Sequence, residues 1–101
     1  LEGKQLNDSE LTQIIAKFRN LFQIMIDYKI SHGDMKASNF IFHNEKLFVL
    51  DLDGMKRHQS NRPFKKAIRK DFNRFMKNWR NNEYEEEFKR LIDELEILTN
   101  S

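Results

Sequence analysis

Residues 32–43 read HGDMKASNFIFH, and residues 47–54 read LFVLDLDG, in a chain that has only three glycines and one proline. Asp34, Lys36 and Asn39 come just before the first apolar run, and Asp51 comes directly after the second. An ordinary helical domain has no need of such a cluster. The cluster in these two stretches therefore indicates a functional site.

A small β-hairpin is predicted between these polar groups. Residues 40–43 and 47–50 are short runs of residues that favour strands, and the polar residues 44–46 join them as a tight turn. A loop followed by a hairpin that returns to the same end brings Asp34, Asn39 and Asp51 near one another.

A long helix is predicted before this segment. Residues 7–9 offer several capping side chains, and apolar residues recur at three- and four-residue steps from Leu11 to Tyr28. The width of this apolar stripe indicates a central, largely buried helix of about five turns.

Two further helices are predicted after the hairpin. Residues 54–61 form a polar loop without periodicity, and Ser60 or Asn61 can cap a helix that has apolar residues on one side and basic residues on the other. Residues 84–98 carry apolar positions on one face of a third helix. The expected fold class is mainly α (α+β), with residues 1–101 forming one unit.

Composition excludes several classes of protein. The chain has 101 residues, 39% hydrophobic and 34% charged, which allows one compact domain. It has no apolar run long enough to span a bilayer and no secretory signal pattern. The absence of cysteine excludes disulfides and thiolate metal sites. Because Leu1 is not a natural start, we expect a fragment of a longer protein.

Positive charge is concentrated in one segment. Residues 55–80 carry ten Lys and Arg against Asp71 alone, or about +9, whereas residues 81–101 carry two against seven acidic residues. Such a field attracts polyanions, including phosphorylated glycolipid, anionic membrane and nucleic acid. The alternative is a solvated helix face that the following acidic segment neutralises.

The polar cluster has the chemistry of phosphoryl transfer. Two carboxylates and an amide oxygen suit a hard cation such as Mg²⁺, and a lysine beside them suits a phosphate that the ion also contacts. An acceptor for the proton of the nucleophile, metal ligands and a cation on the migrating group are the parts that this reaction needs.

The two stretches resemble the catalytic and metal-binding loops of the protein-kinase-like fold. They are most similar to those of the bacterial lipopolysaccharide core kinases, which phosphorylate heptose or Kdo sugars of the inner core. Residues 32–40 match the family pattern HGDxKxxNF, and residues 49–55 match its metal-binding turn LIDLD. Residues 71–75 and 78–79 are similar to the helix that follows in those proteins.

The resemblance implies roles for individual residues. Asp34 would accept or orient the proton of the substrate hydroxyl, and Lys36 would lie against the transferred phosphate. Asn39 and Asp51 would hold Mg²⁺, with ATP as the donor. Asp53 stands where protein kinases have glycine, and it could reach the metal or the sugar.

Supporting roles are implied as well. His32 would pack beneath the loop and fix its backbone. Asp71 would accept hydrogen bonds from the backbone of the catalytic loop, or else pair with Arg74 or Lys70 at the surface. Glu2 and Gly3 would lie in a connector, residues 1–6, that meets the adenine between two lobes.

Only the larger, C-terminal lobe of such a kinase is represented. The smaller lobe supplies a glycine-rich loop and a strand lysine, and nothing in the sequence resembles either. We therefore expect little or no activity from this polypeptide alone, which would need the missing N-terminal lobe as a partner. The glycine at position 33, where protein kinases keep an arginine, favours a small-molecule or glycolipid acceptor.

The expected setting is the cytoplasmic face of a bacterial inner membrane. The basic helix, residues 65–80, would face anionic glycolipid or membrane, and no nucleic-acid partner is expected. Three other functions stay open: a catalytically silent kinase-like binding module, a small-molecule kinase of the choline or aminoglycoside type, and a nucleic-acid-binding helical domain. His43 and His58 are expected to be ordinary surface residues.

Overall fold

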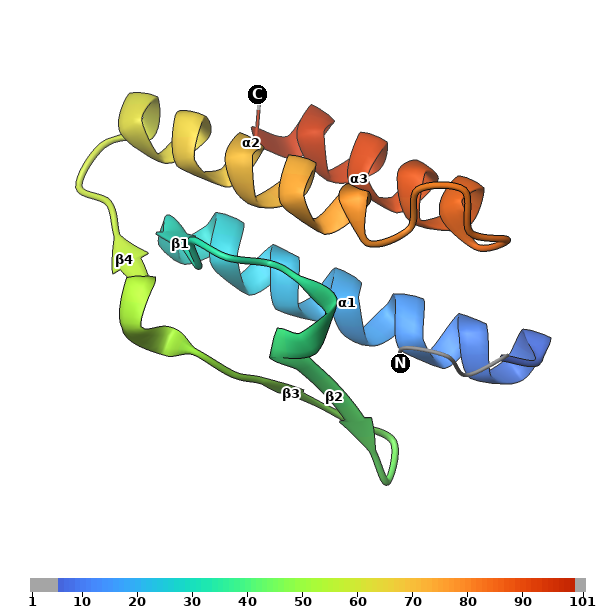
Figure 1. Cartoon of the computed structure of the whole chain (residues 1–101). Helices are drawn as coiled ribbons and strands as arrows, with labels where there is room; N and C mark the ends of the chain where they lie inside the picture. The colour runs from blue at the N-terminus through green and yellow to red at the C-terminus, as the bar shows by residue number, and fades with distance from the viewer. Residues whose placement is uncertain (1–5, 100–101) are drawn as a thin grey trace.

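The computed structural model describes residues 6–99, which are mainly helical with a small hairpin, as the sequence predicts (Figure 1). Two helices, α2 and α3, run antiparallel as one layer, and α1 lies between this pair and the β2–β3 hairpin. The elements are α1 (Asp8–Tyr28), β1 (Ile30–Ser31), β2 (Phe40–His43), β3 (Lys46–Val49), β4 (Lys56–Arg57), α2 (Asn61–Lys77) and α3 (Glu85–Thr99), with 3₁₀ turns at Ala37–Asn39 and Leu52–Gly54.

A capping box starts α1. The side chain of Asn7 accepts a hydrogen bond from the Glu10 amide at 2.8 Å, and the Glu10 carboxylate accepts one from the Asn7 amide at 3.3 Å. Lys29 ends the helix in a left-handed conformation, with φ 55°. The buried stripe is narrower than predicted, because Ile24 and Tyr28 are 53% and 56% exposed.

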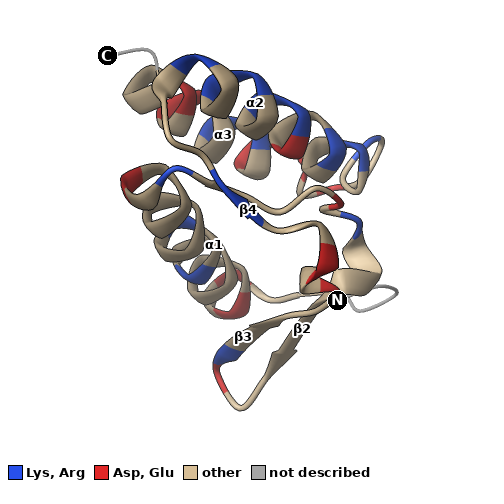
Figure 2. Ribbon diagram, turned by 90° about the vertical axis from the view of Figure 1, so that its left-hand side faces the viewer, with Lys and Arg blue, Asp and Glu red and all other residues tan. Residues whose placement is uncertain are grey.

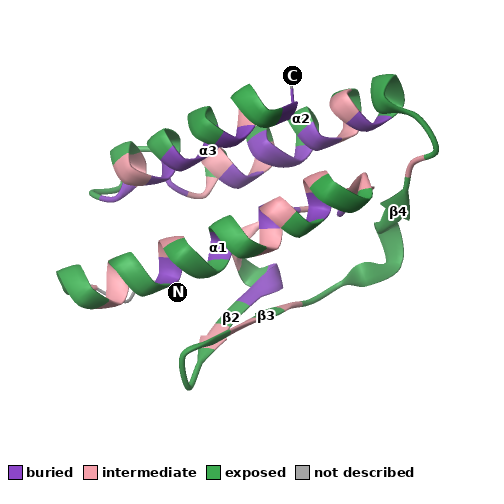
Figure 3. Cartoon of the chain, turned by 180° about the vertical axis from the view of Figure 1, so that it is seen from behind, coloured by how far each residue is buried: buried purple, intermediate pink, exposed green. Residues whose placement is uncertain are grey.

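Aromatic rings from four elements form the centre of the core. Phe75 of α2 lies 5.0 Å from the rings of both Phe18 and Phe22 of α1, measured between ring centroids. It also contacts Phe40 of β2 at 6.0 Å and Phe88 of α3 at 5.6 Å. Edge-to-face pairs of this kind add to the stabilisation from burial alone. Figure 3 shows the buried positions facing the interior between the helices.

The hairpin has one face on the core and one in solvent. Phe40 pairs with Val49 and Ile41 with Phe48, in an antiparallel register. Because side chains alternate along a strand, Phe40 points into the core while Ile41 and Phe48 are 46% and 47% exposed. The register also brings Asn39 opposite Leu50, just before Asp51.

The prediction of an unstructured loop at residues 54–61 is wrong in part. Within it, β4 pairs antiparallel with β1, so that Ile30 lies opposite Arg57 and Ser31 opposite Lys56. A two-residue strand has no alternation to detect, and its partner lies 25 or more residues away in the sequence. Only the folded chain brings these backbones together.

The two C-terminal helices follow the predicted boundaries closely. Ser60 is the N-cap residue of α2, but its side chain makes no capping hydrogen bond. The helix ends at Lys77, so Arg80, which we placed on the basic helix, lies in the turn that follows. Three glutamates in the first turn of α3, Glu85–Glu87, complement its helix dipole. Among residues 6–99, no helix combines the length and the apolar character that crossing a bilayer requires.

Candidate active site

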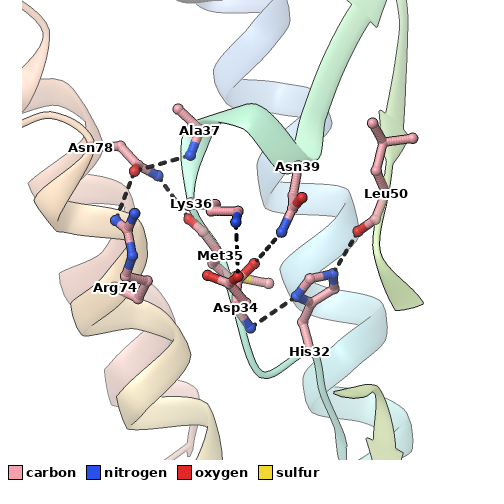
Figure 4. Close-up of polar contacts among 9 residues, drawn as sticks. All are labelled: His32, Asp34, Met35, Lys36, Ala37, Asn39, Leu50, Arg74 and Asn78. Atoms are coloured by element: carbon pink, nitrogen blue, oxygen red, sulfur yellow. Dashed lines mark hydrogen bonds and ion pairs between the residues drawn. The ribbon is translucent and has the colours of Figure 1, made fainter. Parts of the chain in front are cut away.

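Four hydrogen bonds close a ring around the backbone of Asp34. Figure 4 shows those made by the side chains of His32 and Asn39. The Asp34 amide donates to Nδ1 of His32 (3.1 Å), and Nε2 of the same imidazole donates to the carbonyl oxygen of Leu50 (2.9 Å). The Leu50 amide donates to the carbonyl oxygen of Asn39 (2.7 Å), and Nδ2 of Asn39 donates to the carbonyl oxygen of Asp34 (2.8 Å). Because a backbone N–H can only donate, Nδ1 of His32 is the acceptor and the ring proton is on Nε2.

The ring fixes the position of Asp34 without using its carboxylate. The amide and the carbonyl of Asp34 both have hydrogen-bond partners, the side chains of His32 and Asn39. Both partners are buried, with 1% and 6% of their surface exposed. Hydrogen bonds that form a network in a poorly solvated place reinforce one another. The carboxylate therefore projects from a rigid backbone and keeps its oxygens for other contacts.

Lys36 lies beside this carboxylate. Its Nζ is 3.5 Å from Oδ2 of Asp34, and the two side chains are 45% and 42% exposed. An ion pair this open to water is worth about 0–1 kcal/mol of stability at most. Folding therefore gains little from the pair. It does place a proton acceptor and a cation side by side at the surface, which is the combination that phosphoryl transfer uses.

Asp71 holds the start of the loop. Its carboxylate accepts from the amides of His32 (2.7 Å) and Gly33 (2.9 Å), and the residue is 3% exposed. These are the contacts with the loop backbone that the sequence analysis gave as one of two alternatives for Asp71. The other alternative, an exposed partner for Arg74 or Lys70, is wrong, since Asp71 is buried and both of its oxygens accept from the loop amides.

Gly33 is required by the shape of the loop. Its φ of +101° is in the region that side chains rarely adopt, and a Cβ there would lie 3.3 Å from the carbonyl oxygen of Gly54. The backbone of the loop that carries Asp34 and the segment after Asp51 thus pass very close to each other. This contact joins the two motifs that the sequence places about twenty residues apart.

Asp51 follows the ring directly, because the Leu50 backbone bonds to both Asn39 and His32. Its backbone is left-handed, with φ 57° and ψ 68°, a conformation that aspartate adopts more readily than most residues with a Cβ. Both Asp51 and the neighbouring Asp53 are exposed.

The predicted magnesium ligands, Asn39 and Asp51, each have a side-chain oxygen without a committed role in the loop. Nδ2 of Asn39 is committed to the Asp34 carbonyl, which leaves Oδ1 as the atom that can face a cation. Within residues 6–99, no three His, Asp or Glu side chains gather as a metal site. Mg²⁺ commonly takes one or two carboxylates and completes its shell with water and phosphate oxygens, so Asn39 and Asp51 fit its needs. Their role stays a prediction.

Asn78 is the residue that sequence reasoning missed. Its side chain bonds to the backbone of Met35 and Ala37 and to Arg74 (Figure 4). The sequence offered only the likeness of residues 78–79 to a helix of the kinase family. Nothing in the spacing indicated that this carboxamide would reach a loop some forty positions earlier.

Two other expectations have different outcomes. His58 is not an ordinary surface residue, because its Nε2 lies 2.8 Å from Oγ of buried Ser31 and its ring packs against Phe64 at 6.0 Å. Its backbone amide also donates to the carbonyl of Lys29 (2.8 Å), so it closes the β1–β4 pair. Glu2 and Gly3, predicted to meet the adenine, lie outside the described residues.

No protein-family model, curated protein or solved structure matches this chain. What the chain does must therefore be inferred from the loop itself: a fixed backbone, an exposed Asp34–Lys36 pair, and two possible cation ligands next to them.

Proposed function

We propose that this chain is the catalytic-loop lobe of an ATP- and Mg²⁺-dependent kinase whose acceptor is a hydroxyl of a lipopolysaccharide inner-core sugar, heptose or Kdo. The observation that carries the proposal is the hydrogen-bond ring, which fixes the Asp34 backbone and leaves its carboxylate exposed at 3.5 Å from Lys36. A loop built only for stability would have no reason to leave a positioned carboxylate and ammonium in solvent.

Each residue has a defined part in this reaction. The Asp34 carboxylate orients the acceptor hydroxyl and takes its proton, which contributes roughly 10²–10⁴-fold to the rate. The Lys36 ammonium neutralises charge on the transferred phosphoryl group. Asn39 and Asp51 would bind the magnesium ion, which supplies charge neutralisation for the nucleotide phosphates when bound. His32 and Asp71 hold the loop and take no part in the chemistry.

The acceptor class is supported by the surroundings of the loop. Gly33 and Lys36 agree with the lipopolysaccharide kinase pattern, whereas kinases of choline or aminoglycosides usually have histidine or asparagine two residues after the aspartate. A silent binding module would have no need of Asp34, Lys36, Asn39 and Asp51 together. The smaller lobe that would cover the nucleotide is expected from a partner or a further part of the protein.

A basic surface on α2 fits an anionic membrane. Figure 2 shows Lys and Arg along the outer side of this helix. Counting about 100° per residue around the helix axis, Arg62, Lys66 and Arg69 lie about 140–180° from Asp71, and Lys70 and Lys77 lie about 100–120° from it. The centre of this basic stripe is thus on the side of α2 opposite the loop that Asp71 contacts. We assign the stripe to membrane docking, separate from the acceptor site; its exposed members are Arg62, Lys66, Arg69, Lys70 and Lys77.

The decisive test is transfer of labelled phosphate from ATP to core oligosaccharide that lacks the phosphate. The assay uses the longest polypeptide in which this chain is encoded, and compares wild type with Asp34→Asn and with Asp93→Asn, an exposed aspartate on α3. We expect Mg²⁺-dependent transfer that falls by about 10²-fold or more in Asp34→Asn and is unchanged in Asp93→Asn. Equal transfer by both variants, or transfer to choline or an aminoglycoside in place of the sugar, would refute the proposal.

A further inference from the structure

Asn78 brackets Lys36 with two hydrogen bonds. Nδ2 of Asn78 donates to the carbonyl oxygen of Met35 at 2.7 Å, and Oδ1 accepts from the amide of Ala37 at 3.0 Å. One bond precedes Lys36 in the chain and the other follows it. This is the pattern by which a residue of one parallel strand bonds to the residues on either side of its neighbour. The carboxamide of Asn78 thus imitates a strand residue placed beside Lys36.

The backbone of Lys36 has the matching conformation. Its φ of −73° and ψ of 153° are extended, and the 3₁₀ turn Ala37–Asn39 begins immediately after it. Met35, on the other side, is fully buried. With the Met35 side chain in the core and Asn78 on both flanking peptides, the direction in which Lys36 leaves the loop is fixed.

Arg74 fixes the orientation of the carboxamide. Its guanidinium donates to Oδ1 of Asn78 at 2.9 Å, on the same oxygen that accepts from Ala37. Two donors on one side and the Met35 carbonyl on the other allow only one placement of the oxygen and nitrogen. Asn78 itself is the C-cap residue of α2, so its backbone position is set by the helix.

We infer that Asn78 is a positioning residue that aims Lys36 at the phosphoryl group, an inference that rests on the proposed kinase function. Asp71 and Asn78 are seven residues apart on α2, which is two turns and about 10 Å along the same face. Asp71 holds residues 32–33 and Asn78 holds residues 35–37, so both ends of the segment carrying Asp34 and Lys36 are anchored to one rigid helix.

The substitution Asn78→Asp separates positioning from folding. The carboxylate still accepts from the Ala37 amide and from the Arg74 guanidinium, now as an ion pair, so the fold is retained. It cannot donate to the Met35 carbonyl oxygen, and instead turns a negative charge toward that oxygen. Asn73→Asp is the matched control: the same change, on the same helix, at an exposed position with no hydrogen bond described. Asn78→Ala removes both anchoring bonds.

Two measurements test the inference. In steady-state transfer assays on the full encoded protein, we expect Asn78→Asp to lower kcat by about 100-fold with little change in the KM for ATP, since a misplacement of about 1 Å has an effect of that size. Asn73→Asp should match wild type. By amide hydrogen exchange, Ala37 should exchange about tenfold faster in Asn78→Ala, which is the loss of about one hydrogen bond, while the Gly33 amide stays protected by Asp71.

The outcomes are distinguishable. If wild type transfers phosphate and Asn78→Asp does so equally well, the positioning role is overturned and the kinase proposal stands. Unchanged exchange of Ala37 in Asn78→Ala would overturn the anchoring itself. If wild type transfers nothing to any acceptor, the kinase proposal fails, and the positioning role of Asn78 in it fails as well.

Discussion

Replacing Asp71 should release the start of the loop that carries Asp34. This carboxylate is 3% exposed and satisfies two backbone amides, His32 at 2.7 Å and Gly33 at 2.9 Å. Hydrogen bonds to a charged group contribute about 1.5–3 kcal/mol each, so Asp71→Ala should lower the free energy of unfolding by about 3–6 kcal/mol. Domains of this size are stable by about 5–15 kcal/mol, so the expected loss is a large part of the total stability.

A second variant keeps the experiment informative. Asp71→Asn retains one acceptor oxygen but turns an NH₂ group toward the second amide, so it should cost about half as much, roughly 1.5–3 kcal/mol. Denaturation in urea, followed by circular dichroism, gives both values. Asp93→Asn is the control, since Asp93 is exposed and its contact with Lys89 lies on the surface of α3.

Both Asp71 variants must be less stable than Asp93→Asn, in the order alanine, then asparagine. If Asp71→Ala lay within about 0.5 kcal/mol of wild type, as is usual for surface substitutions, the carboxylate would not be holding the loop. The account of how Asp34 is positioned would then be wrong.

Two further results are expected. Gly33→Ala should lower the free energy of unfolding by about 1–2 kcal/mol, because φ is +101° and the new Cβ would meet the carbonyl of Gly54 at 3.3 Å; an unchanged urea midpoint would show that the loop relaxes freely. The double substitution Lys66→Glu and Arg69→Glu should abolish sedimentation of the protein with phosphatidylglycerol vesicles at low salt. The control Arg90→Glu, which reverses an exposed charge on α3, should sediment as wild type does. Tighter binding of wild type to duplex DNA than to these vesicles would contradict membrane docking.

Local signals were enough to predict the framework. A helix or strand with one buried face leaves a periodic pattern of apolar residues in its sequence. The three- and four-residue spacing of α1 is such a pattern, and so is the alternation of Phe40, Ile41 and Phe42. The β1–β4 pair and the Ser31–His58 contact left no such signal, because they join segments more than twenty residues apart through backbone groups and one polar pair.

The same distinction explains why Asp71 was foreseen as a possible anchor and Asn78 was not. A lone aspartate among aromatic residues must find donors, so its burial has a consequence that can be argued from sequence. A carboxamide at a helix end can make its hydrogen bonds to water, so the neighbouring residues in the sequence do not indicate a distant partner. Because both anchors belong to α2 and its C-cap, the place of the Asp34–Lys36 pair relative to Asp51 depends on how α2 packs through Phe75 onto α1. A core substitution at that contact, far from the carboxylate, would shift the loop together with its helix and change this relation.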